Sequence, residues 1–121
     1  MSATPNSTIQ SILKELPTLV SVAVVETETG MPLAFHSNVA DFDIETAAAY
    51  NTEVVKAKLK AISALKLNQK IQDILLTLTD QLHLLKLSPD AGKFIYLAVN
   101  AKDTNLAMAR SVLKNYAEVL N

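Results

Sequence analysis

Apolar and polar positions follow a helical period from residue 43 to residue 67, which predicts one long helix. Its apolar residues form two arcs. One arc contains Ile44, Ala48, Val55, Leu59 and Ile62, and the second contains Ala47, Tyr50, Val54, Ala57, Ala61, Ala64 and Leu65. Asn51 and Lys58 lie between the arcs, and the polar side contains Glu45, Thr52, Glu53, Lys56, Lys60 and Ser63.

A helix that lies on one sheet needs an apolar stripe only a little over ~100° wide, and this helix has about twice that width. The second arc is rich in alanine, which lets another backbone approach closely. We therefore expect the second arc to face a partner. The alternative is a helix sunk more deeply into its own core.

Shorter apolar segments predict five strands. They lie at residues 20–25, 33–36, 71–79, 81–87 and 93–99. The first segment is apolar on both faces, which is typical of a strand in the middle of a sheet that is covered on both sides. Turns are expected at Thr29-Gly30, at Asp80 and at residues 89–92.

Two shorter helices flank this pattern. Ser7 is expected to cap the first, with Gln10 completing a capping box, and Pro17 ends it. Asp103 is expected to cap the last helix. For the long helix, the candidates are Asp41 or Asp43 at the start and Asn68, in a left-handed conformation, at the end.

The predicted order is therefore α-β-β-α-β-β-β-α in one domain spanning residues 7–121, after a flexible tail of residues 1–6. A five-stranded, mostly antiparallel sheet with the long helix on one face and two helices on the other would bury each apolar stripe. The expected fold class is a three-layer α/β (α+β) sandwich.

Composition narrows the classes of function. The net charge is −1, from 11 basic and 12 acidic residues, which gives no electrostatic reason to expect nucleic acid or anionic lipid as a partner. No cysteine is present, no apolar segment approaches the ~20 residues that cross a bilayer, and no signal peptide is evident. We expect a cytoplasmic protein without membrane insertion.

The residues that carry chemistry are few. The chain has two glycines and no phosphate-binding glycine motif, so we expect no nucleotide cofactor. His36 and His83 fall on separate predicted strands and are better explained as surface strand residues than as a zinc pair. No nucleophile stands out, so we expect neither a catalytic nor a metal site.

Two other features have simple structural explanations. Asp41, Asp43 and Glu45 resemble the start of a calcium loop, but they lack its glycine and distal glutamate, and helix capping accounts for them. Arg110 is the only arginine and so the only candidate for an arginine finger. Its place in the middle of a helix favours a solvent-facing role.

Several local features together resemble the roadblock/LC7 domain family, from residue 7 to residue 120, a family whose layered architecture is related to that of profilin-like domains. They are the strand Val20-Ser-Val-Ala-Val-Val25 leading into Glu26-Thr-Glu-Thr-Gly30, the long alanine-rich helix, the hairpin ladder, and the segment Asn105-Leu-Ala-Met-Ala-Arg110-Ser-Val-Leu113. The resemblance implies a non-enzymatic protein that pairs through its third strands and long helices. The helix pair then serves as a platform for Ras-like small GTPases, or as an adaptor surface on dynein and signalling scaffolds.

The resemblance also implies roles for individual residues. The helix seam of the dimer would contain Ala47, Tyr50, Val54, Ala57 and Ala61. The joining strand would contain Gln72, Ile74, Leu76 and Leu78, and the GTPase-facing residues would be Glu53, Lys56 and Lys60. Lys58 and Asn51 interrupt the apolar surface and leave the packing angle at the seam open.

The leading hypothesis is a homodimeric regulator or scaffold that binds a Ras-like small GTPase, with modulation of GTP hydrolysis as a further role. The alternative is a structural adaptor, similar to a dynein light chain, whose partner is indifferent to nucleotide. A small-molecule sensor and an enzyme that depends on His36 or His83 have less support. Homodimer and heterodimer both stay open.

Overall fold

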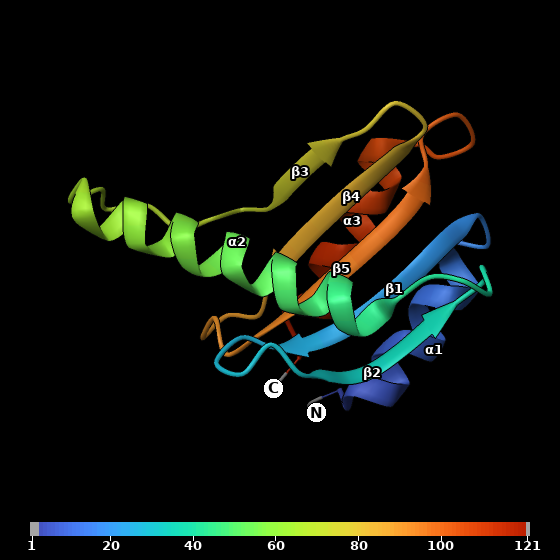
Figure 1. The fold of residues 1–121 in the computed structure, drawn as a ribbon, viewed down its shortest axis with the longest axis horizontal. Helices are drawn as coiled ribbons and strands as arrows, with labels where there is room; N and C mark the ends of the chain where they lie inside the picture. The colour runs from blue at the N-terminus through green and yellow to red at the C-terminus, as the bar shows by residue number, and fades with distance from the viewer. Residues whose placement is uncertain (1–2, 121) are drawn as a thin grey trace.

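The computed structural model describes residues 3–120 and contains one five-stranded sheet in which every neighbouring pair is antiparallel. The strand order is β2-β1-β5-β4-β3, so β2 and β3 form the two edges (Figure 1). The strands are β1 (Leu19–Glu26), β2 (Pro32–Ser37), β3 (Ile74–Thr77), β4 (Gln81–Leu87) and β5 (Lys93–Asn100). Each of the five strands overlaps the segment in which the hydrophobic pattern predicts it.

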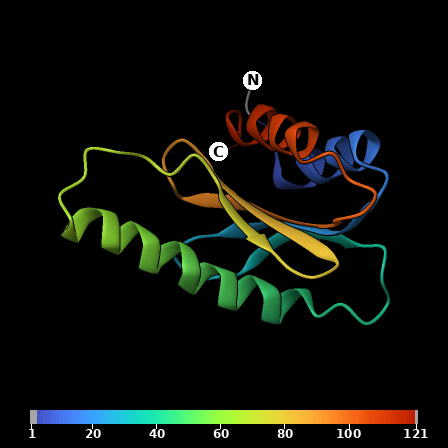
Figure 2. The same ribbon diagram turned by 90° about the horizontal axis from the view of Figure 1, so that it is seen from above.

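Three helices cover the sheet: α1 (Pro5–Glu15), α2 (Ile44–Ala64) and α3 (Leu106–Ala117). Figure 2 shows α2 on one face and α1 with α3 on the other. The element order and the three-layer arrangement confirm the predicted fold class.

The central strands β1 and β5 are buried on both faces because a helical layer covers each side. Val22, Leu97 and Ile95 belong to the apolar cluster that includes residues of α1 and α3. Ala23 and Tyr96 belong to a second cluster, which includes the buried apolar residues of α2. The alternation of side chains along a strand thus separates the two halves of the core.

Only the first half of α2 is embedded in this core. Its buried residues are Ile44, Ala48, Thr52 and Val55, and none follows Val55. The burial of Ile44, Ala48 and Val55 confirms that the arc predicted to contain them, which we call the inner arc, faces the core in this half of the helix. The assignment of Thr52 to the polar side was wrong, because Gly30 lies directly against it: a Cβ added at Gly30 would come within 3.3 Å of Thr52 Oγ1. Thr52 Oγ1 donates to the carbonyl of Ala48, which satisfies the buried hydroxyl.

Two helix starts differ from the predictions. Helix α1 is capped by Thr4 rather than by Ser7, so residues 5 and 6, expected in the tail, are helical. Ser7 instead occupies the third helical position and bonds back to Thr4, while Pro5 takes the first turn, where its missing N–H costs nothing. Helix α3 is capped by Asn105 and not by Asp103.

The end of α2 and the start of β3 also differ. The carbonyls of Ile62 and Ser63 accept the N–H groups of Leu67 and Lys66, which is a Schellman motif, and Lys66 takes the left-handed conformation at φ 56°. The helix therefore ends at Ala64, before the expected Asn68. Strand β3 has only four residues, so Gln72 lies outside the strand in which it was placed.

Candidate functional site

The second arc of α2 is uncovered. Tyr50 and Val54 are 69% and 41% exposed, Ala57 and Ala61 are exposed, and Ala47 is half-buried. These residues recur every three or four positions along the helix and so form one stripe. The structure thus leaves on the surface the stripe that the sequence pattern assigned to a partner.

The C-terminal half of α2 forms an overhang, which we define as residues 56–64. It extends about 13 Å at the helical rise of 1.5 Å per residue, and Figure 1 shows it projecting beyond the sheet. Leu59 and Ile62 from the inner arc are only half-buried there, and Leu65 just beyond is 69% exposed. Both apolar arcs therefore lack a full cover in this half of the helix.

Edge strand β3 continues the exposed apolar surface on the same face of the sheet. Ile74 packs against the cluster beneath α2, and strand alternation places Leu76 on that same face. Leu76 is 51% exposed, and Leu78, just after the strand, is 40% exposed. We call the stripe of α2, the apolar side chains of the overhang and these β3 side chains the seam surface.

His83 on β4 borders the seam surface, because it is the strand partner of Leu76. Its Nε2 lies 2.8 Å from Gln81 Oε1, and its Nδ1 lies 3.3 Å from the hydroxyl of Tyr96. The two rings meet edge to face at 5.4 Å between centroids. Burial lowers the pKa of His83 and raises the pKa of Tyr96 to about 12, so both groups favour their neutral forms.

We expect His83 to make the fold less stable in mild acid. Its pKa is lowered in the folded chain, so as the pH falls through the ordinary value of 6.5 the unfolded chain binds the proton first and stability falls. The free energy of unfolding, measured in urea at about pH 7.5 and about pH 5.5, should fall less for His83→Gln than for the natural sequence. His36→Gln is the matched control and should retain the full fall. An equal fall in all three proteins would contradict this role for His83.

The residues expected to face a GTPase lie on other sides of α2. Glu53, Lys56 and Lys60 are exposed. The Lys56 ammonium donates to the carbonyl of Glu28 at 2.7 Å, so it fastens α2 to the hairpin between β1 and β2. Lys56 therefore makes a hydrogen bond within the fold that the sequence did not suggest.

The histidines and acidic residues considered as candidate catalytic or metal-binding groups have structural roles or lie apart from one another. His36 lies on β2 and His83 on β4, with β1 and β5 between them, so they do not meet. Within residues 3–120 no group of three potential metal ligands is found. Asp43 caps α2 by accepting the Thr46 N–H at 3.0 Å, and its bonds to Thr46 lower the pKa of its carboxyl.

Arg110 forms an ion pair that sequence analysis missed. Its Nε and one terminal nitrogen donate to the two carboxylate oxygens of Asp73 at 2.9 and 3.2 Å. This fork-shaped contact joins α3 to the segment before β3. Arg110 therefore has a positioning role in the fold, and no local pattern could have revealed a partner so distant in the chain.

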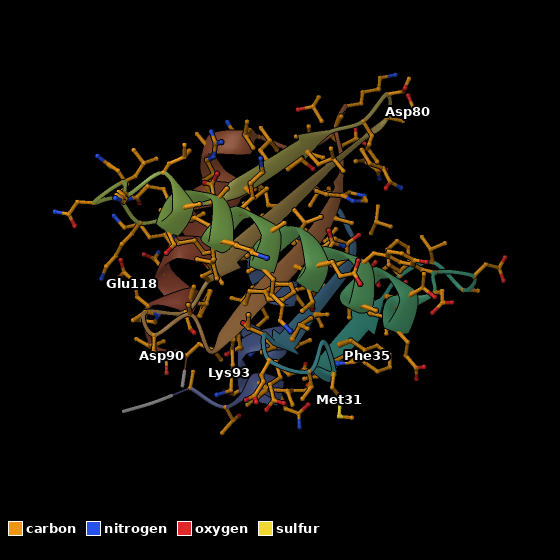
Figure 3. All side chains as sticks on the ribbon, turned by 60° about the vertical axis from the view of Figure 1, so that its left-hand side comes forward. Met31, Phe35, Asp80, Asp90, Lys93 and Glu118 are labelled. Carbon is orange, nitrogen blue, oxygen red and sulfur yellow. The ribbon has the colours of Figure 1, made fainter. Side chains whose placement is uncertain are left out.

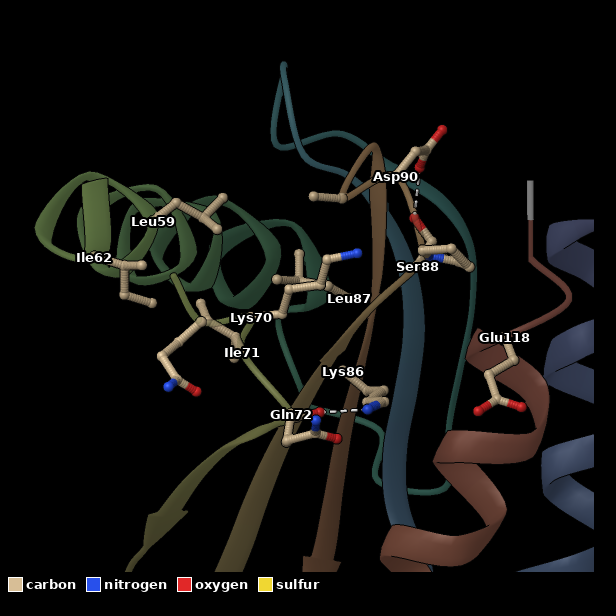
Figure 4. Close-up of a pocket in the computed structure, with 13 residues that line it drawn as sticks. Leu59, Ile62, Lys70, Ile71, Gln72, Lys86, Leu87, Ser88, Asp90 and Glu118 are labelled. Carbon is tan, nitrogen blue, oxygen red and sulfur yellow. Dashed lines mark hydrogen bonds between the residues drawn. The ribbon is translucent and has the colours of Figure 1, made fainter. Parts of the chain in front are cut away.

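A pocket of about 390 Å³ lies under the overhang, between α2, the segment before β3 and the turn after β4 (Figure 4). Leu59, Ile62 and Leu87 contribute apolar walls. The Lys86 ammonium beside it donates to the carbonyl of Gln72. One wall belongs to the overhang, so whatever covers the overhang also determines the shape of this pocket.

None of the helices described between residues 3 and 120 combines the length and apolar character needed to span a bilayer.

No protein-family model and no curated protein matches this chain in sequence. Solved structures do match in shape. Myxococcus xanthus MglB superposes with a TM-score of 0.81 at 12% identity, covering 93% of this chain and 88% of that one. A Roadblock/LC7 domain from Streptomyces avermitilis gives 0.80 at 10% identity, over 96% and 93%. MglC from Myxococcus xanthus gives 0.57 at 20% identity, over 93% and 92%. The chain therefore has the roadblock/LC7 fold.

Proposed function

We propose that the chain is a regulatory or scaffold protein that dimerises through the seam surface and binds a Ras-like small GTPase. The observation that carries the proposal is the uncovered apolar surface formed by α2 and β3. Single exposed apolar residues are common on proteins, but a contiguous patch indicates an interaction site. Tyr50, Val54, Leu65 and Leu76 are all more than 40% exposed on it.

Strand β3 supports pairing with a second copy. Among the described residues it pairs only with β4, so its other edge has free backbone donors and acceptors. An antiparallel β3 from a second copy would satisfy them and continue the sheet. The overhang would then lie over the sheet of that copy, which would cover the arc that contains Leu59 and Ile62, while the second α2 would cover the arc that contains Ala57 and Ala61.

The two polar residues near the stripe do not oppose this packing. Asn51 donates its side-chain amide to the carbonyl of Ala47 at 2.8 Å, so one of its amide donors is already paired within the helix. Lys58 is exposed, and a lysine can lay its alkyl chain along an apolar surface while its ammonium reaches water. The seam would then bury apolar atoms while leaving few buried polar groups without a hydrogen-bond partner.

The GTPase part of the proposal rests on the resemblance of the sequence to roadblock/LC7 domains and on the shared fold with MglB. In a dimer the two α2 helices would lie side by side, with Glu53, Lys56 and Lys60 still in solvent. They would give the platform a mixed polar rim of the kind that surrounds protein interfaces. We propose no chemistry by this chain itself; its effect would come from the contact.

The test is a pull-down from native lysate with the purified protein as bait, carried out with GDP in one arm and a non-hydrolysable GTP analogue in the other. Enrichment of a Ras-like protein only with the analogue is expected. The same partners in both arms would overturn the GTPase role in favour of a structural adaptor. Ala57→Glu bait, placed in the seam, tests whether that binding needs the dimer.

A further inference from the structure

We infer that edge strand β2 is a second docking surface, which takes an extended segment of a partner protein with apolar side chains at alternate positions and basic residues on either side. It lies at the sheet edge opposite β3. The inference therefore goes beyond the proposed function and stands or falls independently of it.

The first observation is a row of exposed apolar side chains. Met31, Leu33 and Phe35 alternate along β2 and the turn before it, and they are 61%, 37% and 58% exposed. Phe35 is the strand partner of Ala23, whose side chain belongs to the cluster beneath α2. The row therefore lies on the α2 face of the sheet, and Figure 3 shows Met31 and Phe35 at the same margin of the molecule.

The second observation is the free edge of the strand. Within residues 3–120, β2 pairs only with β1. The Asn38 N–H donates to the carbonyl of Val20 at 2.9 Å, and antiparallel alternation then directs the backbone of His36 toward β1 and that of Phe35 outward. An added strand would bond to these outward groups while its alternate side chains pack on Leu33 and Phe35.

The surface is held in place before any partner arrives. The backbone at Gly30 abuts α2, where a Cβ added at Gly30 would lie 3.7 Å from the Cα of Ala49. The bond from Lys56 to the carbonyl of Glu28 fixes the same hairpin. A surface that is already ordered loses little conformational entropy on binding, which favours affinity.

The charges around the row select the partner. Glu28 on the hairpin, Asp41 in the connection from β2 to α2, and Glu45 in the first turn of α2 are exposed, and Lys56 already bonds to the hairpin. Basic residues flanking an apolar segment would complement these carboxylates. Pairing of two copies through β2 would instead bring like charges together. Charge thus favours a different protein over a second copy at this edge.

The probe for this surface is a fluorescein-labelled peptide, Arg-Lys-Val-Thr-Val-Thr-Val-Lys-Arg, titrated with the full protein and followed by anisotropy. We expect saturable binding that weakens at least about tenfold for Phe35→Thr, since an anchoring aromatic carries a large share of interface affinity. Met108→Thr makes a comparable change on α3, where Met108 is 56% exposed, and should leave the affinity unchanged. Proline in place of the central valine should abolish binding, because proline lacks the N–H that an added strand needs.

Each contrary result overturns the inference. Absence of saturable binding, equal binding of the proline peptide, or equal weakening by Met108→Thr would each exclude strand addition at β2. A peptide with glutamates in place of its basic residues should bind far more weakly, and equal affinity would refute the charge argument. In the natural sequence, amide hydrogen exchange at Phe35 should become slower when the peptide is added. This measurement locates the contact without relying on a variant.

Discussion

Replacing Ala57 by glutamate should convert the proposed dimer into monomers. Ala57 is exposed in the single chain and lies within the stripe that also contains Tyr50 and Val54. In the proposed dimer this position would be covered by the second α2. A carboxylate there would be buried without a partner, which costs several kcal/mol, or would hold the helices apart.

We expect the dissociation constant of the dimer to rise at least about 100-fold, since each ~1.4 kcal/mol changes an equilibrium constant tenfold. Sedimentation equilibrium over a range of protein concentrations measures it. Ser63→Glu adds the same charge at an exposed position on the polar side of α2 and should leave the dimer intact. Circular dichroism is the control measurement that checks whether both variants are folded. An unchanged mass for both Ala57→Glu and Ala61→Glu would exclude this seam.

Leu97→Ala should cause the largest loss of stability that we predict for one substitution. Leu97 is fully buried on β5, the central strand, within the cluster that includes α1 and α3. Removing its branched end leaves a cavity with helices on one side and a sheet on the other, so the site cannot collapse easily. Leucine-to-alanine changes in such cores cost roughly 2–5 kcal/mol, and about 3 kcal/mol is expected here.

Urea unfolding at one fixed protein concentration measures this loss, since dimerisation would make stability depend on concentration. Met108→Ala is a control on α3, where Met108 is 56% exposed and the change should stay within about 0.5 kcal/mol. Repeating both measurements on an Ala57→Glu background separates core packing from pairing. Equal midpoints for Leu97→Ala and Met108→Ala would contradict the assignment of Leu97 to the core.

The sequence predicted the elements well where the evidence was local and repeated. The helical period of α2 and the doubly apolar pattern of β1 each extend over many residues, so single exceptions do not hide them. Caps depend on one residue among several similar candidates. Thr4 and Asn105 were missed for this reason, because Ser7 and Asp103 also suit a helix start.

Errors at the candidate site have tertiary causes. Thr52 is buried where Gly30, from a hairpin far from it in the sequence, lies against it. Gln72 lies outside β3 because that strand pairs with β4 only from Ile74 onward. The apolar alternation of the β2 row was visible in the sequence, but no local pattern shows that β2 is an edge strand. The roles of the seam residues in a dimer stay predictions.

The overhang of α2 also bears on how the amount of this protein would be controlled. A newly made chain presents residues 56–64 uncovered, with both apolar arcs accessible. Quality-control chaperones and proteases recognise exposed apolar segments of this kind, and small differences in the folded fraction change abundance several-fold. Chains without a partner would be removed faster than paired ones. Because the proposed partner is a second copy, pairing would protect a larger fraction of the chains as their concentration rises, so the level of the protein would depend more steeply than linearly on how fast it is made.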